Sequence, residues 1–148
     1  PERGVAHVDF TNPYCRRLRA KVIKCLERTD IPFHKTGCYV CTEGPRFETA
    51  AEIKMFAMLG GDIVGMTNIP ESVLAREAEM CYTNCSIVTN MAAGISPTPL
   101  SHSEVVEAMA QSGKNMARLI EAFIADNGDD ETECGCAHCM AEFGGFKL

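Results

Sequence analysis

The stretch that most constrains the fold is residues 43–52, which lie between a predicted strand and a predicted helix. Residues 34–42 are predicted as the strand. A Gly-Pro pair ends it, because proline fixes its own φ and biases the residue before it toward an extended conformation. Residues 49–59 are predicted as the helix, which a Gly-Gly pair ends. Phe47 and Glu48 therefore lie at a strand-to-helix corner, where open α/β sheets usually bind their ligands.

The same alternation of short apolar runs and helical stretches continues along the chain. The predicted elements are an extended segment 1–12, a helix 13–28 opened by Pro13, strand 34–42, helix 49–59, strand 62–66, helix 70–80 opened by Pro70, strand 85–89 and a long helix from the capping box Ser101-x-x-Glu104 to about residue 126. This order predicts the α/β class with a mostly buried sheet. We expect one α/β portion over 1–127 and a flexible acidic, Cys-rich tail over 128–148.

Charge and hydropathy argue against two classes of partner. The net charge of -6 makes nucleic acid or an anionic membrane surface an unfavourable partner. No apolar run approaches the roughly 20 residues that a membrane span needs. The sequence also contains no Gly-rich loop of the kind that cradles a phosphate.

The nine cysteines cannot all pair within the chain, because their number is odd. Cys38 and Cys41 form a C-x-x-C inside a predicted strand, which favours core packing over chemistry. The tail contains three more cysteines and a histidine in the run Cys134-Gly-Cys136-Ala-His138-Cys139. Four ligands within six residues make a poor tetrahedral site by themselves.

Several separate motifs carry a family resemblance. They are the run 43–52, Gly65-Met-Thr-Asn-Ile-Pro-Glu71, Val88-Thr-Asn-Met-Ala-Ala-Gly94, and the opening Arg3-Gly-Val-Ala-His7 and Asn12-Pro-Tyr-Cys15. In this order, from about residue 3 to 126, they resemble the trimeric purine nucleoside phosphorylase and methylthioadenosine phosphorylase family. The resemblance implies that family's mixed sheet flanked by helices. It also implies that this sequence corresponds to about the C-terminal half, with the phosphate loop in the part that precedes it.

The resemblance implies roles for three residues around a purine base. Asn90 corresponds to the residue that binds the leaving purine, where an amide can accept from a protonated N7 and donate to O6. Glu48 corresponds to the acceptor for N1–H of a 6-oxopurine, and Phe47 to the ring that packs on the base. Without the resemblance, Glu48 would be interpreted as a first-turn acid that the helix dipole stabilises, and Asn90 as a turn residue.

The resemblance also implies residues around the sugar. Met66 matches the residue under the ribose, and Thr67 the one that bonds sugar or phosphate; Thr89 fits the 6-oxopurine version of its motif. His102 matches a histidine that bonds the ribose 5′-OH in nucleoside-type members. His7 matches a histidine that a neighbouring subunit contributes in the methylthio-type branch, so the sequence combines features of both branches.

The resemblance therefore implies phosphorolysis of inosine or guanosine in purine salvage, with phosphate as co-substrate and no metal or cofactor. It implies a cytoplasmic homotrimer or dimer of trimers. Two alternatives stay open: a methylthioinosine or methylthioadenosine phosphorylase, and an inactive fragment or structural companion chain. In the tail, the resemblance favours a C-x-C disulfide over a metal site.

Overall fold

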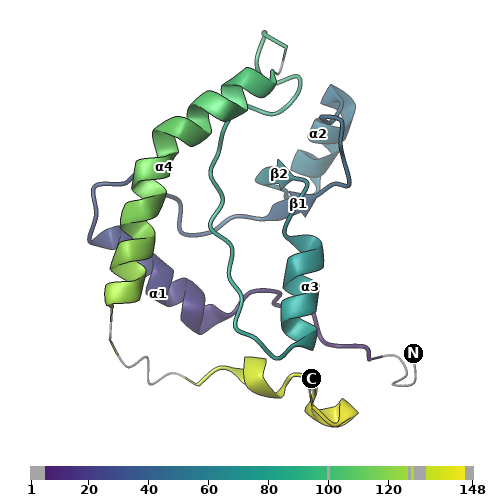
Figure 1. Ribbon diagram of the computed structural model, residues 1–148. Coiled ribbons are helices and arrows are strands. Elements are labelled where there is room, and N and C mark those ends of the chain that lie inside the picture. Colours follow the sequence, from purple (N-terminus) through teal and green to yellow (C-terminus); the bar gives the residue numbers. More distant parts are fainter. Residues whose placement is uncertain (1–5, 100, 127, 129–132, 146–148) are drawn as a thin grey trace.

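The computed structural model describes residues 6–99, 101–126, 128 and 133–145, and its main elements are four α-helices and two short parallel strands. The elements are α1 (Arg16–Glu27), β1 (Tyr39–Cys41), α2 (Ala50–Met58), β2 (Ile63–Gly65), α3 (Ile69–Glu77), α4 (His102–Ala125) and two short 3-10 helices, η1 (Gly135–His138) and η2 (Ala141–Phe143). Helices and sheet are mixed along the chain, so the predicted α/β class is confirmed (Figure 1).

The sheet pairs β1 with β2 in parallel, with Tyr39 opposite Ile63 and Cys41 opposite Gly65. Parallel strands need a crossover connection, and α2 supplies it. The parallel register places the carboxyl ends of both strands at one edge of the sheet. That edge leads into the predicted ligand corner on one side and into α3 on the other.

Side-chain caps explain where the helices begin. Thr49 and Glu52 form a reciprocal capping box at α2, and Ser101 accepts a hydrogen bond from the Glu104 N–H at α4. The prediction that Pro13 opens the first helix was wrong by three residues. Cys15 is extended and its Sγ accepts from the Leu18 N–H, so α1 starts after this cap.

The core lies between α1 and α4, which cross each other in Figure 1. Cys25 and Leu26 of α1 pack against Leu119 of α4. Lys21 adds polar contacts at the same junction, because its ammonium donates to the Asp126 carbonyl at 2.7 Å and lies 4.9 Å from the centre of the Phe123 ring. The long helix is therefore held to α1 along its C-terminal half.

Two predicted segments differ in the structure. Residues 85–89 run extended between α3 and α4, but no strand is formed there among the described residues. The apolar run predicts an extended conformation, whereas a strand also needs a partner to pair with its backbone. The strand predicted over 34–42 is formed only over Tyr39–Cys41.

The tail also departs from the expectation of flexibility. Residues 133–145 form η1 and η2 and lie beside α3, as Figure 1 shows in yellow. The Met140 N–H donates to Glu79 at 3.1 Å, and the Cys139 thiol donates to the Arg76 carbonyl at 2.9 Å. The rest of the predicted tail, and the first five residues of the predicted extended segment, lie outside the described residues, except Gly128.

Candidate functional site

The candidate site lies where the two parallel strands end. Thr42 follows β1, and its N–H donates to the Gly65 carbonyl at 2.9 Å. Met66 and Thr67 follow β2 directly, so they start from the same edge of the sheet. The Cys41 thiol donates to the Thr67 carbonyl at 3.2 Å, which ties the two segments together. The carboxyl edge of a parallel sheet is the usual place for a ligand.

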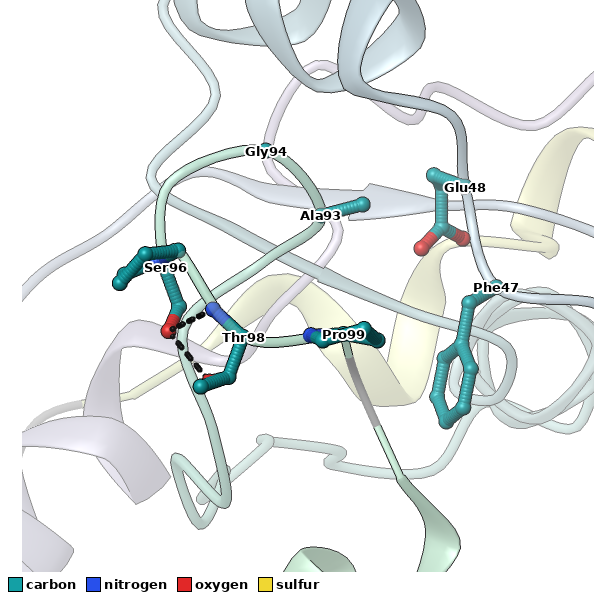
Figure 2. A pocket seen from close by; sticks show the side chains of 8 residues that line it. Phe47, Glu48, Ala93, Gly94, Ser96, Thr98 and Pro99 are labelled. Atoms are coloured by element: carbon teal, nitrogen blue, oxygen red, sulfur yellow. Dashed lines mark hydrogen bonds between the residues drawn. The ribbon is translucent and has the colours of Figure 1, made fainter.

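Glu48 is held in place by a residue of this edge. The Thr42 hydroxyl donates to Glu48 Oε1 at 2.6 Å, which orients the carboxylate. A hollow of about 410 Å³ opens beside it. Its lining consists of the corner residues Phe47 and Glu48 and the loop residues Ala93, Gly94, Ser96, Pro97, Thr98 and Pro99. Figure 2 shows the Glu48 carboxylate on the side toward Ala93, with the Phe47 ring beside Pro99.

The loop that closes the hollow depends on a glycine. Gly94 has φ +78°, and a Cβ there would lie 2.4 Å from Cβ of Ala50, the first residue of α2. Only glycine accommodates both the left-handed backbone and this close approach. Within the loop, Ser96 and Thr98 share a hydroxyl hydrogen bond at 2.9 Å, drawn in Figure 2. The loop is therefore packed directly on the start of the helix that follows Glu48.

A second glycine brings Met66 against the corner. Gly44 has φ +70°, and a Cβ on it would lie 2.5 Å from the Met66 Sδ. The thioether thus packs on the backbone just before Phe47 and Glu48, on the cis Gly44-Pro45 bond. Arg46 pairs with Glu52 at 2.8 Å, and this contact, with the capping hydrogen bonds from Thr49, lowers the pKa of Glu52 to about 2.

The remaining predicted residues lie outside the lining of this hollow. Asn90 is partly buried, and its Nδ2 donates to Thr89 Oγ1 at 3.1 Å, at the start of the loop that closes the hollow. His102 is exposed on the first turn of α4, and His7 is exposed in the segment before α1. The structure therefore brings Phe47 and Glu48 together with the loop 93–99. The roles of these two residues and of the other predicted site residues stay predictions.

Sequence analysis missed two parts of this site. Thr42 carries no motif, although its position as the last residue of the predicted strand 34–42, at the ligand edge, was a usable signal. The loop 93–99 falls between the predicted strand 85–89 and the predicted helix from Ser101, but local sequence did not indicate that it forms a wall of the hollow, because its contact with Ala50 is long-range. A separate group of four cysteines lies close enough to share a metal ion, and none of them lines this hollow.

Together the parallel sheet, its helices and the hollow at the carboxyl edge define an α/β protein with a candidate ligand site at a strand-to-helix corner. Known structures share the fold. A methylthioadenosine phosphorylase from an antarctic soil metagenomic library superposes with a TM-score of 0.84 at 27% identity, over 96% of this chain and 51% of its own. A Schistosoma purine nucleoside phosphorylase solved with hypoxanthine superposes with a TM-score of 0.78 at 32% identity, over 86% of this chain and 47% of its own.

The family model described as "Phosphorylase superfamily" matches residues 1–125, and the chain belongs to this superfamily. The 6-oxopurine nucleoside phosphorylase of Pyrococcus furiosus is 54% identical over 92% of this chain and 51% of its own length. A probable 6-oxopurine nucleoside phosphorylase of Moorella thermoacetica is 59% identical over 80% of this chain and 46% of its own length. The chain spans about half the length of the curated relatives it matches.

Among the described residues, no helix combines the length and the apolar character that crossing a membrane requires.

Proposed function

We propose that this chain provides the purine-binding part of a phosphorylase that cleaves 6-oxopurine nucleosides, such as inosine and guanosine, to the free base and ribose 1-phosphate. The observation that carries this proposal is the Glu48 carboxylate, which Thr42 holds at 2.6 Å in a hollow beside Phe47. Relatives of 54% and 59% identity are named 6-oxopurine nucleoside phosphorylase or probable 6-oxopurine nucleoside phosphorylase, which supports the same substrate class.

Glu48 suits a 6-oxopurine because of the hydrogen at N1. An ionised carboxylate only accepts hydrogen bonds, and hypoxanthine and guanine offer an N1–H. Adenine has no hydrogen at N1, so it would offer no hydrogen bond to the carboxylate oxygen that Thr42 does not occupy. The partner Thr42 keeps one oxygen oriented, and the second oxygen remains available to a base that stacks on Phe47.

Asn90 would act on the other edge of the base. The glycosidic bond breaks through an oxocarbenium-like transition state, and negative charge builds up on the leaving purine. The Asn90 side chain can accept from a protonated N7 with its oxygen and donate to O6 with its nitrogen. In the structure its Nδ2 donates to Thr89 Oγ1 at 3.1 Å, so the amide oxygen takes no part in this hydrogen bond.

The sugar and phosphate would lie at the sheet edge. Met66 packs on Gly44 below the corner, a position that suits the apolar face of a ribose, and the exposed Thr67 hydroxyl would bond sugar or phosphate. Phosphate is the nucleophile, so we propose no metal or redox cofactor for the reaction. We further propose purine salvage in the cytoplasm, and a homotrimer or dimer of trimers in which His7 of one copy reaches the site of its neighbour.

A second candidate differs only at the 5′ position of the sugar. A relative of 48% identity from Methanothermobacter thermautotrophicus, over 94% of this chain and 48% of its own, is named probable S-methyl-5′-thioinosine phosphorylase. His102 would favour a 5′-OH, because a thioether cannot return a hydrogen bond to imidazole. Losing one such bond costs about 1.4 kcal/mol, which corresponds to a tenfold preference for inosine.

The test is a panel of phosphate-dependent kcat/KM values for inosine, guanosine, adenosine and methylthioinosine, measured on the protein at its full natural length. We expect inosine and guanosine to exceed adenosine, and inosine to exceed methylthioinosine about tenfold. His102→Val should reverse the second preference, since an apolar wall favours the thioether. A preference of the unmodified protein for methylthioinosine would favour the second candidate function. If adenosine were the best substrate, both candidate functions would be excluded.

A further inference from the structure

Four cysteine sulfurs converge at a place that shares no residue with the lining of the hollow beside Phe47 and Glu48. The Sγ atoms of Cys15, Cys81, Cys134 and Cys136 all lie within 4.8 Å of one another, and those of Cys81 and Cys134 are 3.3 Å apart. Cys15 and Cys136 are buried, with 3% and 6% of their surface exposed, and the other two are partly buried. Four thiols in one small, mostly buried volume form a ready set of soft metal ligands.

The four ligands come from three segments of the chain. Cys15 caps α1, Cys81 follows α3, and the last two belong to the tail at η1. Figure 1 shows the yellow tail passing below α1 and α3, where these segments meet. The Cys15 N–H donates to the Tyr82 carbonyl at 2.7 Å, which joins the first two segments. The tail has its own contacts to Arg76 and Glu79, so the cluster does not depend on the thiols alone.

The distances fit a tetrahedral zinc site better than a disulfide. With Zn–S bonds of about 2.3 Å, a tetrahedron places its sulfurs about 3.8 Å apart. A disulfide needs about 2.05 Å, and all nine cysteines carry free thiols in the structure. A set whose members lie within 4.8 Å of one another requires only small side-chain shifts to enclose Zn²⁺.

The surroundings also suit the charge of such a site. Zn²⁺ with four thiolates carries two negative charges. The Arg17 guanidinium donates to the Cys81 Sγ at 3.5 Å, and the Leu18 N–H donates to the Cys15 Sγ at 3.4 Å. A neighbouring cation and a backbone N–H aimed at the sulfurs both stabilise the thiolate form.

We propose that Cys15, Cys81, Cys134 and Cys136 bind one Zn²⁺ as a structural site that fastens the tail to α1 and α3. Binding exchanges four thiol protons for the metal, so no oxidant or reductant takes part. The other two possible metal ligands of the tail are unsuitable because of their positions. His138 is exposed, and the Cys139 thiol donates to the Arg76 carbonyl. Four protein ligands leave no open position, so the ion would stabilise the fold and take no part in phosphorolysis.

The test uses the protein at its full natural length, produced with zinc in the medium and purified without chelators. Elemental analysis should find about one zinc ion per chain. Replacement by Co²⁺ should give the charge-transfer and intense visible bands of a tetrahedral cobalt–thiolate centre. Removal of the metal with a strong chelator should lower the Tm by at least several degrees and expose four additional thiols to a thiol reagent.

Matched serine variants locate the ligands. Cys134→Ser and Cys136→Ser should lose the zinc, whereas Cys139→Ser and Cys38→Ser should retain it, because these two residues lie outside the cluster. The cobalt spectrum and the thiol count are measured on the unmodified protein, so they decide the question even if a variant does not fold. Fully reduced protein that takes up no zinc would overturn the proposal. Full zinc content in both Cys134→Ser and Cys136→Ser would do the same.

Discussion

At the scale of single residues, the proposed substrate choice rests on which side chains can accept a hydrogen bond and which can donate one. Glu48 only accepts, and Thr42 orients it through a hydrogen bond of 2.6 Å. Asn90 can do both, through the oxygen and the nitrogen of its amide. A site of this kind discriminates strongly, because the wrong base leaves a polar group without a partner. The two residues can therefore be tested by changes that alter hydrogen bonding and little else.

The first prediction concerns the carboxylate and its support. Glu48→Gln should lower kcat/KM for inosine by roughly 10- to 100-fold, because a hydrogen bond to a charged group is worth about 1.5–3 kcal/mol. Thr42→Val should give a smaller loss, mainly in KM, because the carboxylate remains but is no longer oriented. Thr42→Ser keeps the hydroxyl and serves as the matched control. Equal activity of the valine and serine variants would show that Thr42 does not position Glu48.

The second prediction concerns base preference. Asn90→Asp should weaken inosine cleavage about tenfold or more and shift the preference toward adenosine, since a carboxylate accepts from a 6-amino group and cannot donate to O6. Asn84→Asp is the control, because it makes the same chemical change at an asparagine that bonds only Ser86 among the contacts described. The measurement is the ratio of kcat/KM for the two nucleosides. An unchanged ratio in Asn90→Asp would remove this residue from the base site.

At the scale of elements, the site depends on a contact between a loop and a helix. The loop 93–99 approaches the first residue of α2 so closely that only a glycine fits at position 94. The helix start is itself fixed by the capping box of Thr49 and Glu52. Since Phe47 and Glu48 directly precede this cap, the position of α2 decides where both side chains point.

The third prediction tests this contact. Gly94→Ala should destabilise the protein by about 1–3 kcal/mol, because the added Cβ meets Ala50 at 2.4 Å on a left-handed backbone. It should also raise the KM for inosine. Gly113→Ala is the opposite case: this glycine lies inside α4 with nothing within 4 Å of an added Cβ. That substitution should stabilise by about 0.5–1 kcal/mol. Denaturant unfolding measures the change in the free energy of unfolding for both variants. Changes of the same sign would contradict the prediction.

At the scale of the whole molecule, the core is small for the size of the chain. The core cluster of buried side chains joins α1 and α4, while several large apolar side chains of these and other helices are exposed. Examples are Met58, Leu59 and Ile124, each more than 70% exposed. The chain also spans about half the length of its relatives.

The fourth prediction concerns the isolated 148 residues. They should not release hypoxanthine from inosine and phosphate, because the sequence has no Gly-rich loop to cradle the phosphate. Release should appear when the chain is produced at its full natural length. A chromatographic assay of hypoxanthine with and without phosphate measures both. Phosphate-dependent release by the isolated chain would show that its own residues bind the phosphate.

The sequence alone determined the features that depend on neighbours a few residues apart. The helix at 49–59, the capping serine of the long helix and the placement of Phe47 and Glu48 at a corner all follow from local hydrogen bonding and backbone preferences. Short motifs also sufficed for the family, which the match over residues 1–125 confirms. The base and sugar roles of Asn90 and Met66 remain predictions.

Only the tertiary structure decided which distant residues meet. It paired Thr42 with Glu48 and packed Gly94 on Ala50, and it left residues 85–89 without a strand partner among the described residues. Most clearly, it joined the tail cysteines to Cys15 and Cys81, so that a poor ligand set along the sequence became a compact one in space. Local preferences cannot predict such contacts, because their formation depends on the path of the whole chain between them.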